Sequence, residues 1–570
     1  MFNITDFGAV GNGATLNTKA IQQAIDACAA AGGGRVYVPA GTFVTGAISL
    51  RSNIEFHLSA GAVLRGSRNF ADFPIVDRES HEHHFGDGLL TGYRLTNVAI
   101  TGRGKIDGQG DVWWKAMDAG TLHVERPPLV VLIDCERALV DGITLENSPT
   151  WTLVPILCRD LTISNIAIKN PWKPYHNCDG IDLVSCSNVR ISDCTVDTGD
   201  DGICLKSVPL FNGKSFDYAK PRIPCENVLI QNCLVEHAHS GVGIWAEVIG
   251  GMRNVTVNNC IFDGTRTGIR MNRFFPHPGG YVQDIRMDNI IMRRVEYVFE
   301  VANYWDPAKV EAGPDPTTTP VFSNIHFSNI TATKARIACE MYGLPTLPVR
   351  DISFSNIHIE ADKGFELRDA EDILLDNVTV TCPGPALQAK SVRNLEIRRC
   401  NAPQPQADVP VIQLTDVRDA WIHGCTAAAG TGVFVGLVGE GNHDIMLAEN
   451  RLSHAAKAQA PVEPAPLWSS SSYAYSGSAM WRTTGNRNPF LPVPTPVWET
   501  IKREWPVGRI AWAVNGIHRL ESGAHPEIQL APGDKRRIYL ILGWQVDEQL
   551  LILEDGTLLR KAKNFKWQME

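Results

Sequence analysis

The sequence predicts an all-β protein: a right-handed parallel β-helix (a solenoid) with an N-terminal capping helix and a small C-terminal β-rich extension. Short segments of alternating apolar and polar residues, each opened by Asn or Asp, recur at intervals of roughly 20 to 40 residues. Their β-branched residues, and the Asn, Asp and Gly residues at their ends, favour strands over helices. Because one short strand cannot bury its apolar side alone, successive copies must stack on one another.

The repeats share an initial Asn or Asp, an alternating apolar pattern and a small turn residue. The clearest copies are DLTISNIAI from Asp160, NVRISDCTV from Asn188, NVLIQNCLV from Asn227, NVTVNNCIF from Asn254, DIRMDNIIM from Asp284, NIHFSNITA from Asn324, DISFSNIHI from Asp351 and DILLDNVTV from Asp372. Stacked strands lie about 4.8 Å apart, so residues one repeat apart are expected to be spatial neighbours.

The chain begins with a pattern typical of a helix. NTKAIQQAIDACAAA, from Asn17 to Ala31, has a polar start and is followed by three glycines. The open end of a solenoid exposes apolar interior and unpaired strand edges, so this helix is expected to cap it.

Three segments interrupt the repeats: 69–90, 206–224 and 304–319. The first contains His81, His83 and His84, which we interpret as a loop rather than a metal site because no further ligands lie nearby in the sequence. Long loops in a regular scaffold tend to be functional. Beside the acidic repeats, the other two could close one end of a binding site and favour cleavage from a chain end.

The regular strands fade after about residue 451. We predict a catalytic β-helix domain over 1–450, a Pro- and Ser-rich linker or wrapping arm over 451–497, and a small β-rich module over 498–570. The module contains RIAWAV, RIYLILGW and QLLILEDGTLL, the last with a turn signal. It could pack against a second copy of the chain in a homo-oligomer.

Composition excludes several classes of protein. With 53 basic and 62 acidic residues and a formal charge of −9, nothing favours nucleic acid or an anionic membrane. Met1 leads directly into FNITDFGAVG, so a cytoplasmic protein is expected, or a periplasmic or secreted one if a leader has been removed. Many of the 14 cysteines occupy equivalent repeat positions, which predicts a ladder of buried free thiols and favours a reducing compartment.

Two acidic clusters flank the run NVRISDCTV: Asp179 in NCDG, and Asp200 with Asp201 in TGDDG. They are one repeat apart, so they are expected on adjacent coils of one face, with His239 and Arg270 on later coils. We expect both members of the Asp pair to face solvent at a bend, since burying a charge is costly. Mutual repulsion should hold a proton on one of the three, which would then be the natural acid.

These residues resemble the polygalacturonase family of glycoside hydrolases (family 28). The family motifs NTD, a Gly-Asp-Asp, GHG and RIK are matched in order by Asn177-Cys178-Asp179, Gly199-Asp200-Asp201, Ala238-His239-Ser240 and Arg270-Met271-Asn272. TGRGKIDGQGDVWW and ENSPTWTLVPILC are also similar to family segments, and the likeness covers roughly the first 450 residues.

The resemblance implies an inverting hydrolase that needs no cofactor or metal and acts on α-linked pectic or related uronate-containing glycans. It implies that Asp200 is the general acid and that Asp179 and Asp201 position and deprotonate the water. It implies further that His239 helps to hold the acid and the sugar. The predicted substrate-binding residues are Arg270, Asn272, Tyr304 and Asn177.

Two departures from the motifs indicate altered specificity. The family lysine associated with the uronate carboxylate is Asn272 here, so either an uncharged sugar or rescue by Arg273 or Lys206 fits that subsite. GHG has become Ala238-His239-Ser240. A rhamnogalacturonan-type or exo-acting enzyme is therefore favoured. The alternatives are a β-helix polysaccharide lyase that uses Ca²⁺, and a non-catalytic glycan-binding β-helix.

Overall fold

The Asn and Asp residues that open the repeats make the turns of the solenoid. Asn188, Asn227 and Asn254 have φ angles of 57°, 57° and 55°, in the left-handed region that Asn enters more readily than most residues. Their side chains also stack: Asn227 Nδ2 donates to Asn188 Oδ1, and Asn254 Nδ2 donates to Asn227 Oδ1, each at 3.0 Å. The repeated residue therefore fixes the corner of each coil and ties it to the next.

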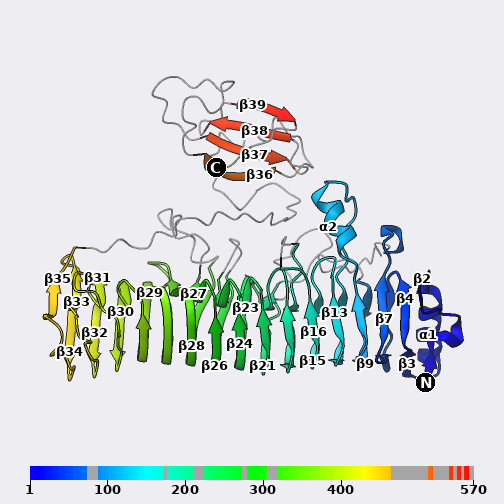
Figure 1. Cartoon of the computed structure of the whole chain (residues 1–570), viewed down its shortest axis with the longest axis horizontal. Helices are drawn as coiled ribbons and strands as arrows, with labels where there is room; N and C mark the ends of the chain where they lie inside the picture. The colour runs from blue at the N-terminus through cyan, green and yellow to red at the C-terminus, as the bar shows by residue number, and fades with distance from the viewer. Residues whose placement is uncertain are drawn as a thin grey trace. The chain divides into compact units, whose positions relative to one another are not determined.

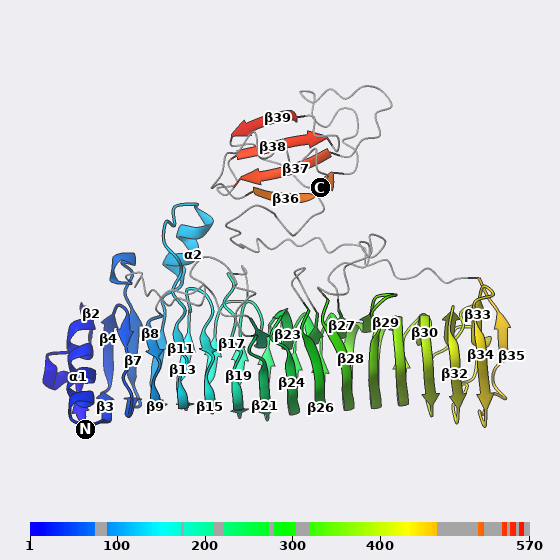
Figure 2. The ribbon, with the colours of Figure 1, turned by 180° about the vertical axis from the view of Figure 1, so that it is seen from behind.

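The structure is a computed structural model that describes residues 1–73, 88–172, 176–208, 222–272, 279–303 and 319–463, and the backbone of strands 511–517, 538–543, 548–553 and 558–563. Successive coils pair in parallel, and Figures 1 and 2 show them side by side from the N-terminal end onward. The predicted parallel β-helix is confirmed.

Three parallel sheets run along the solenoid. The site sheet, which carries the acidic clusters at its strand starts, contains β5 (Ile48–Ser49), β8 (Leu90–Tyr93), β11 (Val130–Ile133), β14 (Leu153–Ile156), β17 (Ile181–Val184), β20 (Ile203–Ser207), β23 (Ser240–Val248), β25 (Thr267–Met271) and β27 (Tyr297–Ala302). It continues through parts of β28 (Val321–Tyr342), β29 (Val349–Thr381) and β30 (Leu387–Arg398) to β31 (Ile412–Thr415), β33 (Val433–Val438) and β35 (Lys457–Pro461).

The other two sheets complete each coil. The second contains β1 (Phe2–Asn3), β3 (Gly34–Val38), β6 (Ile54–Leu58), β9 (Thr96–Gly102), β12 (Glu136–Asp141), β15 (Arg159–Ser164), β18 (Ser187–Ser192), β21 (Cys225–Gln231), β32 (Arg418–His423) and β34 (His443–Ala448). The third contains β2 (Asn12–Leu16), β4 (Gly41–Thr45), β7 (Ala62–Gly66), β10 (Lys105–Asp107), β13 (Thr144–Glu146), β16 (Ala167–Lys169), β19 (Thr195–Asp197) and β22 (Leu234–Glu236). The long strands β24 (Met252–Asp263) and β26 (Tyr281–Arg293) run through both the second and the third sheet.

The core is one continuous column of inward-facing side chains. Phe299, Phe327 and Phe354 stack in it with ring centroids 4.8–5.1 Å apart, a spacing that suits aromatic pairs. All 14 cysteines are free, and all except the half-buried Cys400 are buried. The predicted ladder of buried thiols is therefore confirmed.

The predicted capping helix is α1 (Thr18–Ala30). It buries Ile21, Ala24, Ile25 and Cys28 at the N-terminal end of the core. A second helix, α2 (Asp111–Asp118), projects from a loop and anchors itself through Trp113 and Trp114. Short 3₁₀ helices span Ile4–Phe7 and Phe70–Asp72.

The chain divides into two compact units, Met1–Gly477 and Ser478–Glu570. The described strands of the second unit form one antiparallel sheet of β36 (Ala511–Ile517), β37 (Ile538–Gly543), β38 (Glu548–Leu553) and β39 (Leu558–Lys563). The boundaries at residues 450 and 497 stay predictions.

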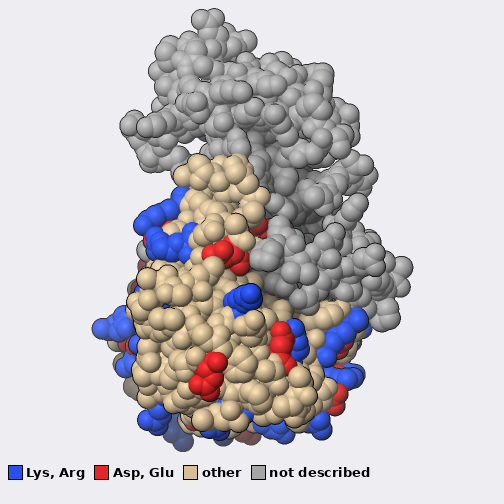
Figure 3. All heavy atoms as spheres, turned by 90° about the vertical axis from the view of Figure 1, so that its right-hand side faces the viewer, with Lys and Arg blue, Asp and Glu red and all other residues tan. Residues whose placement is uncertain are grey.

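Among the described residues, no helix combines the length and the apolar character needed to cross a membrane. Figure 3 looks onto the N-terminal end of the solenoid, where basic and acidic side chains are scattered among uncharged ones. This face carries no extended patch of one sign among the residues that are coloured there.

Candidate active site

Glycines let the coils stack closely where the acidic clusters lie. β17 pairs with β20 so that Ile181 is opposite Ile203, and at the same offset Asp179 is opposite Asp201. The amide of Gly180 donates to Asp201 O at 2.8 Å. A Cβ on Gly180 would lie only 2.4 Å from the carbonyl oxygen of Gly202. The glycines after both aspartates are therefore part of what brings the carboxylates together.

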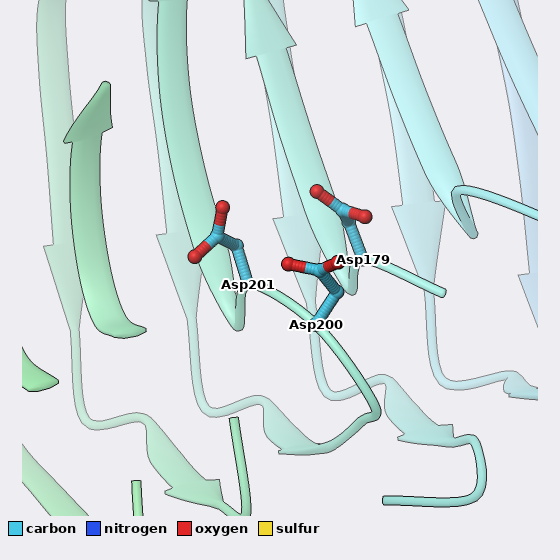
Figure 4. Close-up of side chains that lie close together, drawn as sticks. All are labelled: Asp179, Asp200 and Asp201. Atoms are coloured by element: carbon cyan, nitrogen blue, oxygen red, sulfur yellow. The ribbon is translucent and has the colours of Figure 1, made fainter. Parts of the chain in front are cut away.

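Asp179, Asp200 and Asp201 form the aspartate cluster. One carboxylate oxygen of each lies within 4.8 Å of one oxygen of the others. Figure 4 shows the three side chains gathered at the starts of two neighbouring strands, with Asp200 and Asp201 on the connection that leads into β20. The expectation of adjacent coils is met, while the assignment of these residues as catalytic stays a prediction.

Asp200 is held by a histidine on the next coil. His239 Nδ1 lies 2.8 Å from Asp200 Oδ1, and the backbone amide of His239 donates to the Asp200 carbonyl, also at 2.8 Å. The ring of Trp172 contacts His239 edge to face, with centroids 5.8 Å apart. Asn177 Nδ2 donates to Asp200 Oδ2 at 3.2 Å and is itself oriented by Arg126, which donates to its Oδ1 at 3.2 Å.

Asp201 has a separate set of donors. Ser240 Oγ donates to its Oδ1 at 2.7 Å, and Trp245 Nε1 donates to its Oδ2 at 2.5 Å. The expectation that Asp200 and Asp201 face solvent is wrong, because their exposed fractions are 8% and 1%. Each lies at the predicted bend, but partners on the next coil replace the hydrogen bonds that water would otherwise supply.

Burial affects the three carboxyls unequally. Burial, followed by the charges of Asp182, Asp200 and Asp201, raises the pKa of Asp179 well above its ordinary value. Burial and the charge of Asp200 likewise raise the pKa of Asp201. Burial also opposes ionisation of Asp200, but the charge and hydrogen bond of His239 hold its pKa below the ordinary value.

These directions favour Asp179 or Asp201 as the holder of the shared proton in the free protein. This differs from the expectation that the residue designated as the acid, Asp200, keeps it. The physical reason is the contact with His239, which repulsion among carboxylates alone does not predict.

Arg270 and Asn272 meet at a glutamate on the following coil. The guanidinium carbon of Arg270 lies 3.5 Å from the centroid of the Trp245 ring, and its Nε lies 3.5 Å from Glu300 Oε2. Asn272, at the position of the family lysine, donates to Glu300 Oε1 at 2.7 Å. Arg270 and Asn272 thus lie close together one coil beyond His239, and their role in binding substrate stays a prediction.

Sequence reasoning missed a second buried charge group beside the cluster. Lys206 Nζ lies 3.9 Å from Asp182 Oδ1 and 3.6 Å from Glu247 Oε2, and all three side chains are buried. The charge of Asp182 contributes more than that of either cluster partner to the raised pKa of Asp179. Its position three residues after Asp179, hence in the strand itself, was the available signal. Tyr304 and Arg273 lie outside the described residues.

The oxygens of the aspartate cluster are close enough together to contact one cation. All four oxygens of Asp200 and Asp201 already contact His239, Asn177, Ser240 or Trp245. Ca²⁺ takes six to eight oxygen ligands, whereas three of these neighbours present nitrogens. The donor set suits proton transfer better than it suits the Ca²⁺ chemistry of a lyase.

Comparison with known proteins identifies the family of the chain. The family model described as "Glycosyl hydrolases family 28" matches residues 28–382. The chain is 32% identical over 371 residues to a probable polygalacturonase of Vitis vinifera, covering 63% of this chain and 74% of the relative. It is 26% identical over 443 residues to an exo-poly-alpha-D-galacturonosidase of Dickeya chrysanthemi, covering 66% and 70%.

Among solved structures, the chain is similar to a hyperthermoactive exopolygalacturonase from Thermotoga maritima, with a TM-score of 0.55 and 27% identity. The match covers 66% of this chain and 91% of that one. Residues 28–382, which the family model matches, contain every described residue of the site. These relatives are hydrolases rather than lyases. The chain belongs to family 28 of the glycosyl hydrolases.

Proposed function

We propose that this glycosyl hydrolase cleaves α-glycosidic bonds of pectic or related uronate-containing glycans, with inversion at the anomeric carbon. The observation that carries the proposal is the aspartate cluster, whose three carboxyls meet within 4.8 Å while one of them contacts His239. The Vitis vinifera and Dickeya chrysanthemi relatives, named as enzymes of galacturonans, support the class of substrate.

In the proposed mechanism the transfer of one proton between carboxyl groups of the cluster creates both the general acid and the general base. The proton held by Asp179 or Asp201 passes to the Asp200 carboxylate through a bridging water, which the oxygen separation permits. Asp200 then protonates the glycosidic oxygen as that bond breaks. The carboxylate left behind accepts a proton from the water whose oxygen bonds to the anomeric carbon.

Stereochemistry tests the mechanism directly. Inverting enzymes usually separate their carboxyl groups by about 6.5–9.5 Å and retaining enzymes by about 5–5.5 Å. The nearest oxygen atoms of the cluster lie closer together than the carboxyl groups of either class of enzyme. Two carboxyl groups are farther apart, centre to centre, than their nearest oxygens, so this distance does not assign the stereochemistry. NMR of the first product formed from an α-linked substrate should show the β anomer, and an α anomer would contradict single displacement.

We propose exo action as well, supported by the names of the Dickeya chrysanthemi and Thermotoga maritima relatives. The loops 206–224 and 304–319, interpreted as closing one end of the site, lie largely outside the described residues. An end-labelled oligosaccharide ladder distinguishes the modes, since exo action shortens every chain by a fixed unit from one end. A random spread of early products would contradict it.

The first experiment is incubation with a panel of pectic polysaccharides and oligosaccharides, measuring new reducing ends and ultraviolet absorbance in parallel. Reducing ends without absorbance are expected for hydrolysis, and absorbance from unsaturated ends would indicate a lyase. Asp200→Asn should lower kcat by about 10²- to 10⁴-fold. Asp193→Asn is the matched control, because Asp193 is a turn residue away from the aspartate cluster that accepts a hydrogen bond from Asn232. A non-catalytic binder would show no turnover with either chain.

We also propose that the C-terminal unit mediates self-association and that the protein works in a reducing compartment. The apolar strands of the unit support the first proposal, and the 14 free thiols support the second. Sedimentation of the full chain should give the mass of an oligomer. Thiol titration of protein taken from its native compartment should find the cysteines reduced.

A further inference from the structure

A row of acidic residues continues along the site sheet from Arg270. Parallel pairing places Arg270 opposite Glu300, Glu300 opposite Glu340 and Glu340 opposite Glu366. We call Glu300, Glu340 and Glu366 the glutamate row. They lie on β27, β28 and β29, successive coils in Figure 1, and each step is about 4.8 Å.

The glutamate row faces away from the core. Each glutamate lies between two core residues of its own strand: Phe299 and Val301, Cys339 and Met341, Phe365 and Leu367. Because successive strand residues point to opposite faces, the glutamates lie on the outer face of the site sheet, as Arg270 does between Ile269 and Met271. The row is therefore a direct extension of the predicted substrate-binding surface.

The next residue in register adds an amide that has no partner. Gln388 is opposite Glu366 and only 2% exposed, and neither its Oε1 nor its Nε2 has a hydrogen-bond partner within the described part of the chain. At the other end of the row, Asn272 Oδ1 is likewise buried and unpartnered there. A buried amide without a partner is costly. A sugar hydroxyl, which both donates and accepts, would satisfy either group.

The buried position of the row disfavours another anion. Arg270 lies against Glu300, and Arg368 Nη2 pairs with Glu366 Oε1 at 2.5 Å. No ion pair to Glu340 is found among the described residues. Burial, followed by the charges of Glu300 and Glu366, raises the pKa of Glu340 to about 8, and the charges of Arg336 and Lys363 offset only part of this rise. A carboxylate placed beside Glu340 would be disfavoured by the same burial, and by the same charges of Glu300 and Glu366, that raise this pKa.

We propose that the glutamate row, Gln388 and Asn272 bind uncharged sugar residues and reject galacturonate on the side of the aspartate cluster that leads to the C-terminal coils. The hydroxyls of a neutral sugar pair with the carboxyls and the buried amide groups, whereas a uronate brings a further negative charge to a buried acidic row and is disfavoured there. The inference deepens the proposed function and rests on it.

Three substrates of equal length test the inference: an oligogalacturonate, its methyl ester, and an oligosaccharide that alternates galacturonate with rhamnose. We expect kcat/KM for the oligogalacturonate to be about tenfold below the better of the other two. Added KCl should raise kcat/KM for the oligogalacturonate, because salt screens repulsion. An oligogalacturonate that is the best substrate, or one whose turnover falls with salt, would overturn the inference.

The double variant Glu340→Gln/Glu366→Gln removes two ionisable carboxyls at nearly constant volume. Turnover of the oligogalacturonate should rise about tenfold while that of the alternating substrate changes little. Glu371→Gln is the control, because Glu371 also lies on β29 but pairs with Arg393 on an exposed face. It should change the turnover of neither substrate. Equal changes for all substrates would mean that the row is only structural.

Binding separates this inference from the proposed function. Calorimetry with the Asp200→Asn chain measures affinity for the same three ligands without turnover. Weaker binding of the oligogalacturonate than of the alternating ligand supports the inference even if no substrate is hydrolysed. Equal or tighter binding of the oligogalacturonate overturns it even if hydrolysis is found.

Discussion

His239 Nδ1 lies 2.8 Å from Asp200 Oδ1, and Asp200 is the member of the cluster whose pKa is lowered. Asp179 and Asp201, which lack this contact, have raised pKa values. One imidazole on the next coil therefore distinguishes three chemically identical side chains. Pairs of carboxyls whose environments push their pKa values apart are a common basis for assigning acid and base.

Replacing His239 should reveal what Asp200 does. In His239→Gln the charge that lowers the pKa of Asp200 is lost, so that pKa rises. Because Asp200 has the lowest pKa of the cluster, the acidic limb of the pH profile of kcat/KM then moves to higher pH. If Asp200 acts as the acid, its protonated fraction on the plateau also grows, so the plateau value of kcat/KM rises. The measurement is the full pH profile of the variant and of the wild type.

If Asp200 acts as a base, the acidic limb moves in the same direction but the plateau value of kcat/KM does not rise, and the assignment by resemblance would be wrong. His237→Gln is the control. His237 is exposed and pairs with Asp197 rather than with the cluster, so its loss should leave both limbs in place.

At the scale of single coils, close stacking sets the geometry of the site. Gly180 and Gly202 follow Asp179 and Asp201, and neither has room for a Cβ. The site is thus built into the turn of a coil and depends on the spacing between coils as much as on the aspartates.

Gly180→Ala should separate the two coils at the cluster. The added Cβ meets the Gly202 carbonyl at 2.4 Å, so we expect a loss of about 1–3 kcal/mol in unfolding free energy and a clear loss of kcat. Thermal unfolding and kinetics at low temperature measure the two effects.

Gly104→Ala gives a comparable clash, with its Cβ 2.6 Å from Leu58 Cβ, several coils from the site. It should lower Tm without lowering kcat. Equal kcat losses in both variants would mean that coil spacing at Gly180 has no special role.

The coil also explains what the sequence could and could not predict. Asp179 and Asp201 were expected to be neighbours because one uninterrupted repeat separates them. The glutamate row was not predicted, because loops of different length place its members 40 and 26 residues apart, at Glu300, Glu340 and Glu366. A lone glutamate inside each apolar run, VFEVA, ACEMY and GFELR, was the available signal. Trp245 as a donor to Asp201 was missed because indole orientation depends on packing.

For the whole molecule, the buried acids make stability depend on pH. The pKa of Glu340 rises from an ordinary 4.5 to about 8 in the folded chain. Between these values the folded state holds a proton that the unfolded state has released, so stability falls as pH rises across this interval. Glu340→Gln should remove a slope of about 1.4 kcal/mol per pH unit.

Measuring Tm of both proteins between about pH 5 and about pH 8 checks this prediction. The Tm of Glu340→Gln should exceed the wild-type Tm by the largest amount at the alkaline end. Glu371→Gln, whose carboxylate is paired near the surface, should follow the wild-type curve. A Glu340→Gln curve parallel to the wild type would contradict the raised pKa.

Stacking by whole coils has a consequence for how such an enzyme can change during evolution. Each coil contacts only its neighbours, and the aspartate cluster and the glutamate row occupy different coils of one sheet. Duplication or loss of one coil between them would shift the row relative to the cluster by about 4.8 Å and leave the residues of both unchanged. The length of chain recognised could thus evolve in unit steps while the bond-breaking chemistry is inherited intact.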